Sequence, residues 1–103
     1  MLSEQEISEI YQKEIEKIIY VDDDTIIVLF KYIKDSIDNS INVFCLDRLG
    51  KIRWVISPDK LWPGGFYGSI NLIDGYLYTH HTSSVRYKIN PQTGEVVSSI
   101  MTK

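Results

Sequence analysis

Two adjacent histidines, His80 and His81, are the residues of this chain whose type most suggests chemistry. An imidazole can serve as general acid, general base or metal ligand near neutral pH. The stretch around them has the composition of a strand, in which neighbouring side chains point to opposite faces. We therefore do not expect the two rings to hold one metal ion, and no His-x-His or matching carboxylate spacing accompanies them. We expect one ring to be hydrogen-bonded and partly buried and the other solvated, with a catalytic or ligand role as the alternative.

Two further groups of potentially reactive side chains have structural interpretations. Cys45 stands in an apolar run between Phe44 and Leu46, so we expect a buried thiol. As the single cysteine, it cannot form an internal disulfide or a cysteine-only zinc site. The run Asp22–Asp24 lacks the glycine and the distal glutamate of a calcium loop, so it predicts a solvated turn. The sequence contains no nucleophile elbow or phosphate-binding loop, and we expect no catalytic activity, no metal and no cofactor.

Aromatic side chains gather in the segment Ser57–Tyr67, SPDKLWPGGFY. Two interpretations of this segment stay open. Its side chains can fold back and fill the space between two halves of the domain. Alternatively, Trp62, Phe66 and Tyr67 can form a partly exposed patch with His80, because tryptophan and tyrosine are favoured anchors of interfaces. We take these four side chains as candidate partner-binding residues.

Composition and charge exclude several classes of protein. The chain has 103 residues, of which 44% are hydrophobic, enough for one domain with a modest core. Its net charge of -3 argues against a nucleic-acid-binding protein, which usually carries a basic stripe. We find neither the basic start and apolar run of a signal peptide nor a window of about 18 apolar residues. We therefore expect a cytoplasmic protein that does not enter a membrane.

An amphipathic helix is predicted over residues 1–17. Ser3 and Glu6 have the spacing of a capping box, and further glutamates in the first turns suit the positive end of the helix dipole. The apolar side chains that recur at helical spacing are Ile7, Ile10, Tyr11, Ile15 and Ile18. This stripe is expected to cover a sheet face, with the surface of a partner as the alternative.

The first β-meander is predicted over residues 18–56. Ile26–Phe30 is apolar on both faces, which is typical of a central strand covered on each side. Ile41–Asp47 and Lys51–Ile56 are expected to form a later hairpin of the same unit. Alternation in the last strand places three apolar side chains on one face: Ile52, Trp54 and Ile56.

A connecting loop over residues 57–68 leads to a second β-meander over residues 69–101. Asp74-Gly75 tolerates the positive φ angles of a tight hairpin. Thr82-Ser83 interrupts the next pair of strands. Asn90–Gly94 provides a longer turn, in which the proline presets φ and the glycine can adopt a left-handed conformation.

The two meanders match each other in kind and order. Asp47 corresponds to Asn90, and Gly50 corresponds to Gly94. The two glycines are roughly 44 residues apart, which is the period of four-stranded repeat units. The chain therefore contains an internal repeat.

The repeated elements carry a family resemblance. Leu46-Asp47 before Gly50 and Trp54, together with Ile89–Glu95, resembles the fourth-strand turn of PQQ-like β-propeller repeats over roughly residues 17–101. This resemblance implies two blade-like units. The chain departs from the family because Ser98 stands where a second tryptophan is expected, and two blades cannot close a ring of at least four. No residue that contacts PQQ can be matched, so the resemblance implies no cofactor.

The chain also resembles small uncharacterised bacterial proteins that share the elements LD-x-x-G-x-x-x-W and NP-x-TG and end in Thr-Lys. Some proteins of that kind are found beside toxin genes. The resemblance therefore implies an immunity, or antitoxin-like, protein of the bacterial cytosol.

We predict a mainly β single domain: an N-terminal helix followed by two four-stranded antiparallel meanders. Unclosed meanders leave strand edges that must be covered or paired. Two sheets that face each other, one curved sheet backed by the helix, or an edge-paired dimer would satisfy this need. We favour two small sheets with the helix shielding one opening, and both a monomer and an edge-paired homodimer stay open.

For function, we predict a non-catalytic protein-interaction module. An acidic surface suits a basic partner, because complementary charge speeds encounter. The alternative is a small-ligand or carbohydrate-binding domain that uses the aromatic segment around Trp62.

Overall fold

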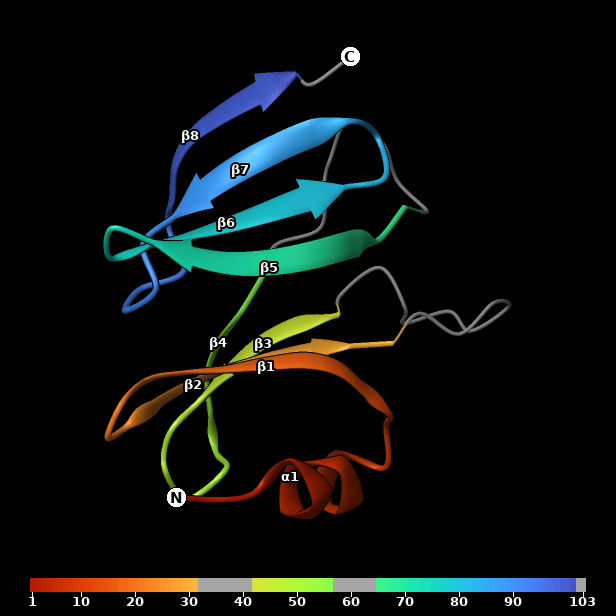
Figure 1. Cartoon of the computed structure of the whole chain (residues 1–103), viewed down its shortest axis with the longest axis vertical. Helices are drawn as coiled ribbons and strands as arrows, with labels where there is room; N and C mark the ends of the chain where they lie inside the picture. The colour runs from red at the N-terminus through yellow and green to blue at the C-terminus, as the bar shows by residue number, and fades with distance from the viewer. Residues whose placement is uncertain (32–41, 57–64, 102–103) are drawn as a thin grey trace.

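The computed structural model describes residues 1–31, 42–56 and 65–101. This part of the chain forms one helix and two separate antiparallel sheets, ordered β1-β2-β3-β4 and β5-β6-β7-β8 (Figure 1). The elements are α1 (Glu4–Tyr11), β1 (Ile15–Asp22), β2 (Thr25–Phe30), β3 (Val43–Leu46), β4 (Ile52–Val55), β5 (Tyr67–Ile73), β6 (Tyr76–His81), β7 (Val85–Ile89) and β8 (Val96–Met101). The predicted mainly β fold is confirmed.

The start of α1 follows the predicted capping box. Ser3 Oγ accepts a hydrogen bond from Glu6 N at 3.2 Å, and Glu6 Oε1 accepts one from Ser3 N at 3.1 Å. The bond from the Ser3 amide, and then the bond with its hydroxyl, hold the pKa of the Glu6 carboxyl below its usual value. Ile7 is fully buried, whereas Ile10 is 53% exposed and does not belong to the buried stripe.

The helix is shorter than the predicted span of residues 1–17. It ends at Tyr11 because Gln12 adopts a left-handed conformation with φ 53°, and the Gln12 amide donates to the carbonyl of Ser8. Ile15 and Ile18 therefore lie in β1 and not on the helix. Their branched side chains suit a strand, so the first meander begins before residue 18.

The first sheet is buried on both faces. Every residue of β2 is buried, as predicted for a central strand. One face, with Val28 and Phe30, packs against Ile7 of α1. The other face, with Ile27 and Leu29, packs against the second sheet. The helix, the first sheet and the second sheet therefore follow one another along the longest axis of the molecule (Figure 1).

The core between the sheets, called the shared core below, joins them into one domain. Its residues are Ile27, Leu29, Val43, Cys45 and Ile56 from the first half, and Tyr67, Ile70, Leu77 and Ile89 from the second. The favoured prediction was two small sheets with the helix shielding one opening; the structure has two sheets, and the helix covers the far face of the first. The alternative of one continuous curved sheet was wrong.

A buried asparagine connects the two sheets. Asn42 Nδ2 donates to the carbonyl of Tyr67 at 2.7 Å and to that of Phe30 at 3.2 Å, while Asn42 Oδ1 accepts from Tyr67 N at 3.0 Å. One side chain thus satisfies both backbone polar groups of Tyr67, as a neighbouring strand would. β5 begins at Tyr67, which pairs with His81 of β6, earlier than the predicted start at Ser69.

Trp54 provides a second connection between the sheets. Its Nε1 donates to the carbonyl of Pro91 at 2.9 Å. Gly94, with φ +78°, lies against the indole ring, and a Cβ built there would be 2.7 Å from Trp54 Cδ2. Gly94 is therefore required both by its turn and by the packing of Trp54.

One predicted face was wrong in β4. Trp54 and Ile56 pack on the shared core, but Ile52 is 51% exposed. The pairing of β3 with β4 shifts register between Cys45 and Leu46, so the strict alternation of the strand is broken.

The internal repeat is visible in the strand pairing. Ile27 pairs with Ile19 on one side and with Cys45 on the other. Tyr78 occupies the corresponding place in the second sheet, where it pairs with Asn71 and Lys88. In the first sheet this row of paired residues is apolar and packs on the shared core. The corresponding row of the second sheet consists of Asn71, Tyr78 and Lys88 and is polar. The second sheet therefore ends the stack with a face that tolerates water, called the outer face below.

Substitution of two glycines tests the Trp54 connection. Gly75 has nearly the same conformation as Gly94, with φ +82°, but nothing lies within 4 Å of a Cβ built on it. Gly75→Ala should lower the free energy of unfolding by about 1–2 kcal/mol, the cost of a left-handed alanine. Gly94→Ala should cost about 1–3 kcal/mol more, because it also displaces the indole ring.

Urea unfolding of both variants measures this difference. Equal losses for Gly75→Ala and Gly94→Ala would show that the Trp54 ring does not depend on the glycine beneath it.

Candidate functional site

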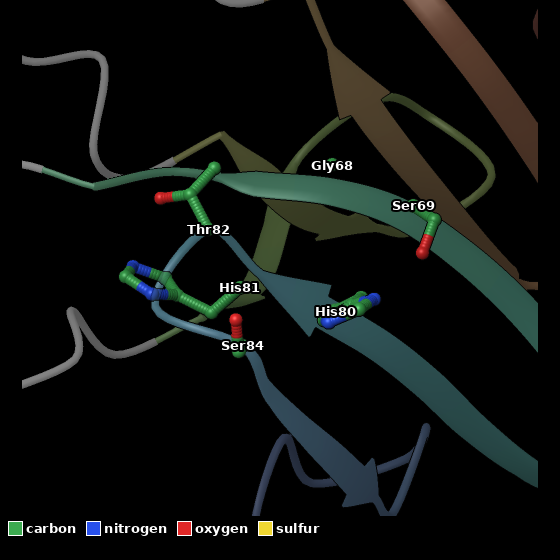
Figure 2. A pocket seen from close by; sticks show the side chains of 6 residues that line it. All are labelled: Gly68, Ser69, His80, His81, Thr82 and Ser84. Carbon is green, nitrogen blue, oxygen red and sulfur yellow. The ribbon is translucent and has the colours of Figure 1, made fainter. Parts of the chain in front are cut away.

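His80 and His81 border a hollow of about 340 Å³ at the end of β6. Figure 2 shows the two rings pointing away from each other, as predicted for neighbours in a strand. His81 is buried and His80 is exposed. The other residues that line the hollow are Gly68, Ser69, Thr82 and Ser84.

His81 closes the turn between β6 and β7. Its Nδ1 accepts a hydrogen bond from Ser83 N at 3.1 Å and lies 2.8 Å from Ser83 Oγ. An Nδ1 that accepts from an amide carries no proton, so a neutral ring holds its proton on Nε2. The ring also lies edge-on to Tyr67, with centroids 4.8 Å apart, and a Cβ built on Gly65 would be 2.5 Å from His81 Cε1. These contacts describe a packed histidine with a structural role.

His80 belongs to the outer face of the second sheet. There the Arg86 guanidinium lies 4.9 Å from the ring centroid of Tyr78, and Lys88 Nζ lies 4.2 Å from that of Tyr76. Strands β5 to β8 contain no aspartate or glutamate. The outer face is therefore cationic and aromatic, although the whole chain is acidic.

Three of the four predicted partner-binding residues, Phe66, Tyr67 and His80, are among the described residues, and Tyr67 is not part of an exposed patch. Tyr67 is 2% exposed and lies in the shared core, so for this residue the space-filling interpretation holds. Phe66 is half-buried, and its amide donates to Thr82 Oγ1 at 3.1 Å. His80 is exposed on the outer face. Trp62 and the rest of residues 57–64 lie outside the described residues.

An acidic hollow of about 570 Å³ lies where the chain reverses between α1 and β1. It is lined by Glu4, Gln5, Ser8, Glu9, Glu14, Ile15 and Lys31. Lys31 Nζ lies 3.5 Å from Glu14 Oε2, but both side chains are exposed, and such a pair stabilises the fold little. The sequence alone did not predict this hollow. The hollow forms because the helix ends early, at Gln12, and the chain then turns back into β1.

Exposed apolar side chains lie at the same end of the molecule as the acidic hollow. The charged residues in the lining of the hollow are three glutamates and one lysine. Ile10 and Leu49 are exposed apolar side chains at this end of the molecule. Ile10 lies against the turn at Gly50, since a Cβ built on Gly50 would lie 3.3 Å from Ile10 Cδ1. This end of the molecule therefore carries exposed apolar side chains in addition to the acidic hollow.

Cys45 is a core residue, as predicted. It is buried, and its Sγ lies 3.8 Å from the carbonyl of Pro91. Burial raises the pKa of the thiol to about 11. Because the thiolate is the nucleophilic form, Cys45 is poorly suited to reaction.

Metal clusters and membrane-spanning helices are both absent from the described ranges. Within residues 1–31, 42–56 and 65–101, no three or more side chains of His, Cys, Asp or Glu lie together where they could hold a metal ion. In the same ranges, no helix has the length and the apolar character needed to pass through a bilayer.

The raised pKa of Cys45 predicts a pH-dependent stability. An unfolded thiol ionises near its ordinary value of 9.0, whereas the folded thiol keeps its proton to about pH 11. The unfolded state therefore binds fewer protons in this interval, and the free energy of unfolding should fall as the pH rises. Cys45→Ala lacks this contribution and should lose less stability between pH 9.0 and about 11.

Urea unfolding of the two proteins across this interval measures the effect. Parallel pH profiles for the wild type and Cys45→Ala would mean that the thiol ionises equally well in both states.

Comparison with known proteins adds one result. No curated protein and no solved structure matches the chain. The likeness to PQQ-like repeats therefore rests on sequence motifs alone. A family described as a domain of unknown function, DUF7957, matches residues 4–100, from the start of α1 into β8. The match includes the helix, both sheets and the acidic hollow, and the chain thus belongs to the DUF7957 family.

Proposed function

We propose that this chain is a non-catalytic protein-interaction module of the cytosol and that its partner is a basic protein. The observation that supports this proposal best is the acidic hollow beside α1, with exposed Ile10 and Leu49 at the same end. Interfaces combine an apolar centre with a polar rim. The carboxylates of the hollow favour a basic partner and speed its approach.

The shape and charge of the hollow suit side chains of a partner. Its volume of about 570 Å³ lies within the range of about 300–1,000 Å³ seen for binding clefts. Glu4, Glu9 and Glu14 surround it, and Lys31 contributes a cation to the lining. A lysine or arginine from a partner would relieve the repulsion among these carboxylates. Such a contact adds favourable energy without any covalent chemistry.

An immunity role is the narrower form of this proposal. It comes from the resemblance to bacterial proteins found beside toxin genes. In this form the partner is a basic toxin, and the acidic end of the module binds it directly. A gene neighbourhood without any toxin would count against the immunity role but not against the broader proposal.

Charge reversal tests the proposed interface. The variant carries Glu4→Lys, Glu9→Lys and Glu14→Lys, which line the acidic hollow. The control carries Asp23→Lys, Glu16→Lys and Glu95→Lys, which are exposed and lie outside that lining. Both variants change the net charge equally, so long-range attraction changes equally in the two.

Partners captured on the immobilised wild type are identified by mass spectrometry, purified, and titrated against all three proteins by calorimetry. We expect the hollow variant to bind at least tenfold more weakly than the control, since it loses close contacts as well as net charge. A partner that binds both variants with equal affinity would place the interface elsewhere.

A further inference from the structure

A hollow of about 290 Å³ lies on the outer face of the second sheet and is called the cationic hollow below. Its lining consists of Ser69 and Asn71 from β5, Tyr78, Thr79 and His80 from β6, and Arg86 from β7. None of these residues is an aspartate or a glutamate. Glu16 of β1 lines a different hollow, beside Phe66 and Gly68. The lining of the cationic hollow therefore contains a guanidinium and no carboxylate.

Arg86 is held over the floor of the cationic hollow by an aromatic ring. It pairs with His80 in the sheet, but its guanidinium leans along the strand and lies 4.9 Å from the ring centroid of Tyr78. A cation within about 6 Å of a ring centroid is attracted by the ring. Within the described ranges the one ion pair joins Lys31 to Glu14, so Arg86 has no carboxylate partner there. The contact with Tyr78 engages no oxygen acceptor, which leaves the N–H donors of Arg86 for the oxygens of an anion.

Lys17 supplies a second cation at the opposite border of the cationic hollow. Its Nζ donates to Asn71 Oδ1 at 3.0 Å. Because an ammonium group can only donate, this bond fixes the orientation of the Asn71 amide, and Nδ2 is the atom of that side chain which can donate to a ligand. Arg86 comes from β7, whereas Lys17 reaches Asn71 from β1 of the first sheet. The two cations therefore flank the hollow from different sides.

The tyrosine rings of the outer face are already in contact with cations. Arg86 lies over Tyr78, and Lys88 Nζ lies 4.2 Å from the ring centroid of Tyr76. A nucleic-acid base binds to such a sheet by stacking on an open aromatic face. Because cations occupy these two rings, the outer face suits an anion better than a stacked base.

Charge and hydrogen-bonding capacity favour a phosphate monoester over a carboxylate. A phosphate group carries a charge of about −1.5 to −2 at pH 7 and three strong acceptor oxygens. A carboxylate has a single charge and two oxygens. Arg86 and Lys17 together balance a dianion, and the planar fork of a guanidinium binds phosphate through two parallel hydrogen bonds. Asn71 Nδ2 and the hydroxyl of Ser69, which both line the hollow, add donors for the third oxygen.

The hollow of about 340 Å³ at the end of β6 adjoins the cationic hollow, because Ser69 and His80 line both. Figure 2 shows these two residues on neighbouring strands at its border. The rest of its lining is small or polar and includes Thr82 and Ser84. Such a lining suits a ligand that carries hydroxyl groups.

We propose that the cationic hollow binds the phosphate group of a small polyol phosphate, such as a sugar phosphate or glycerol phosphate. The polyol part lies in the adjoining hollow at the end of β6. This site is separate from the acidic hollow beside α1 and takes a ligand of opposite charge. Its existence does not depend on the protein partner proposed above.

Titration of the labelled protein with glycerol phosphate, followed by NMR, tests this proposal. The amides of Ser69, Asn71, Tyr78 and Arg86, which line the cationic hollow, should shift and saturate at millimolar ligand. Glycerol, which lacks the phosphate, should leave them unchanged, and inorganic phosphate should shift the same amides but bind more weakly. The absence of saturable shifts at these amides, or equal shifts with glycerol, overturns the proposal. Equal affinity for inorganic phosphate overturns the assignment to a polyol phosphate.

Matched substitutions on β7 separate direct contact from long-range attraction. Arg86→Gln and Lys88→Gln each remove one positive charge and one contact with a tyrosine, but only Arg86 lines the hollow. Arg86→Gln should weaken binding of glycerol phosphate at least about tenfold, the loss expected for charge-assisted hydrogen bonds, and Lys88→Gln should change it far less. Equal weakening by the two substitutions overturns the proposal.

Lys17→Gln provides a second variant, so the test does not depend on the folding of Arg86→Gln. Lys17 is exposed on β1, and its substitution removes the cation on the other side of the hollow. It should weaken binding of glycerol phosphate more than Lys88→Gln does and less than Arg86→Gln does, because Lys17 reaches the hollow through Asn71. Unchanged binding by Lys17→Gln overturns the charge balance on which the choice of phosphate rests.

Discussion

Burial of both faces of the first sheet is the constraint on which the rest of the structure depends. β2 has no polar face, so each of its sides needs a cover. The short helix α1 provides one cover through Ile7, and the second sheet provides the other. Asn42 and Trp54 then fix the second sheet in place by hydrogen bonds to the backbone of Tyr67 and Pro91. Because these bonds satisfy buried polar groups, they specify the arrangement as well as stabilise it.

The same constraint gives the molecule two different ends. The stack can stop at the second sheet because its outer face has Tyr78 and Lys88 where the first sheet has Ile27 and Cys45. At the other end, the reversal of the chain after α1 gathers carboxylates around the acidic hollow. The edge strand β8 lies far from that hollow (Figure 1).

The sequence predicted those features that depend on neighbouring residues. The capping box at Ser3, the two-faced β2 and the turn at Asp74-Gly75 are local, and each is confirmed. The end of the helix was wrong because Ile15 fits a helical stripe and a strand equally well. The burial of Tyr67 depends on the distant Asn42, and no local pattern reports such a contact. The acidic hollow was missed for a related reason, since the fold of the chain creates it and no motif does.

Native-state hydrogen exchange tests most directly whether the two sheets form one cooperative unit. In the wild type, the slowest amides of β2 and β6 should exchange with the same free energy of opening. Asn42→Ala removes the partner of the buried Tyr67 amide and should lower both values equally, by about 1–3 kcal/mol. If the β6 amides lost protection while those of β2 kept it, the second sheet would be an appendage, and the dependence of both sheets on one shared core would be contradicted.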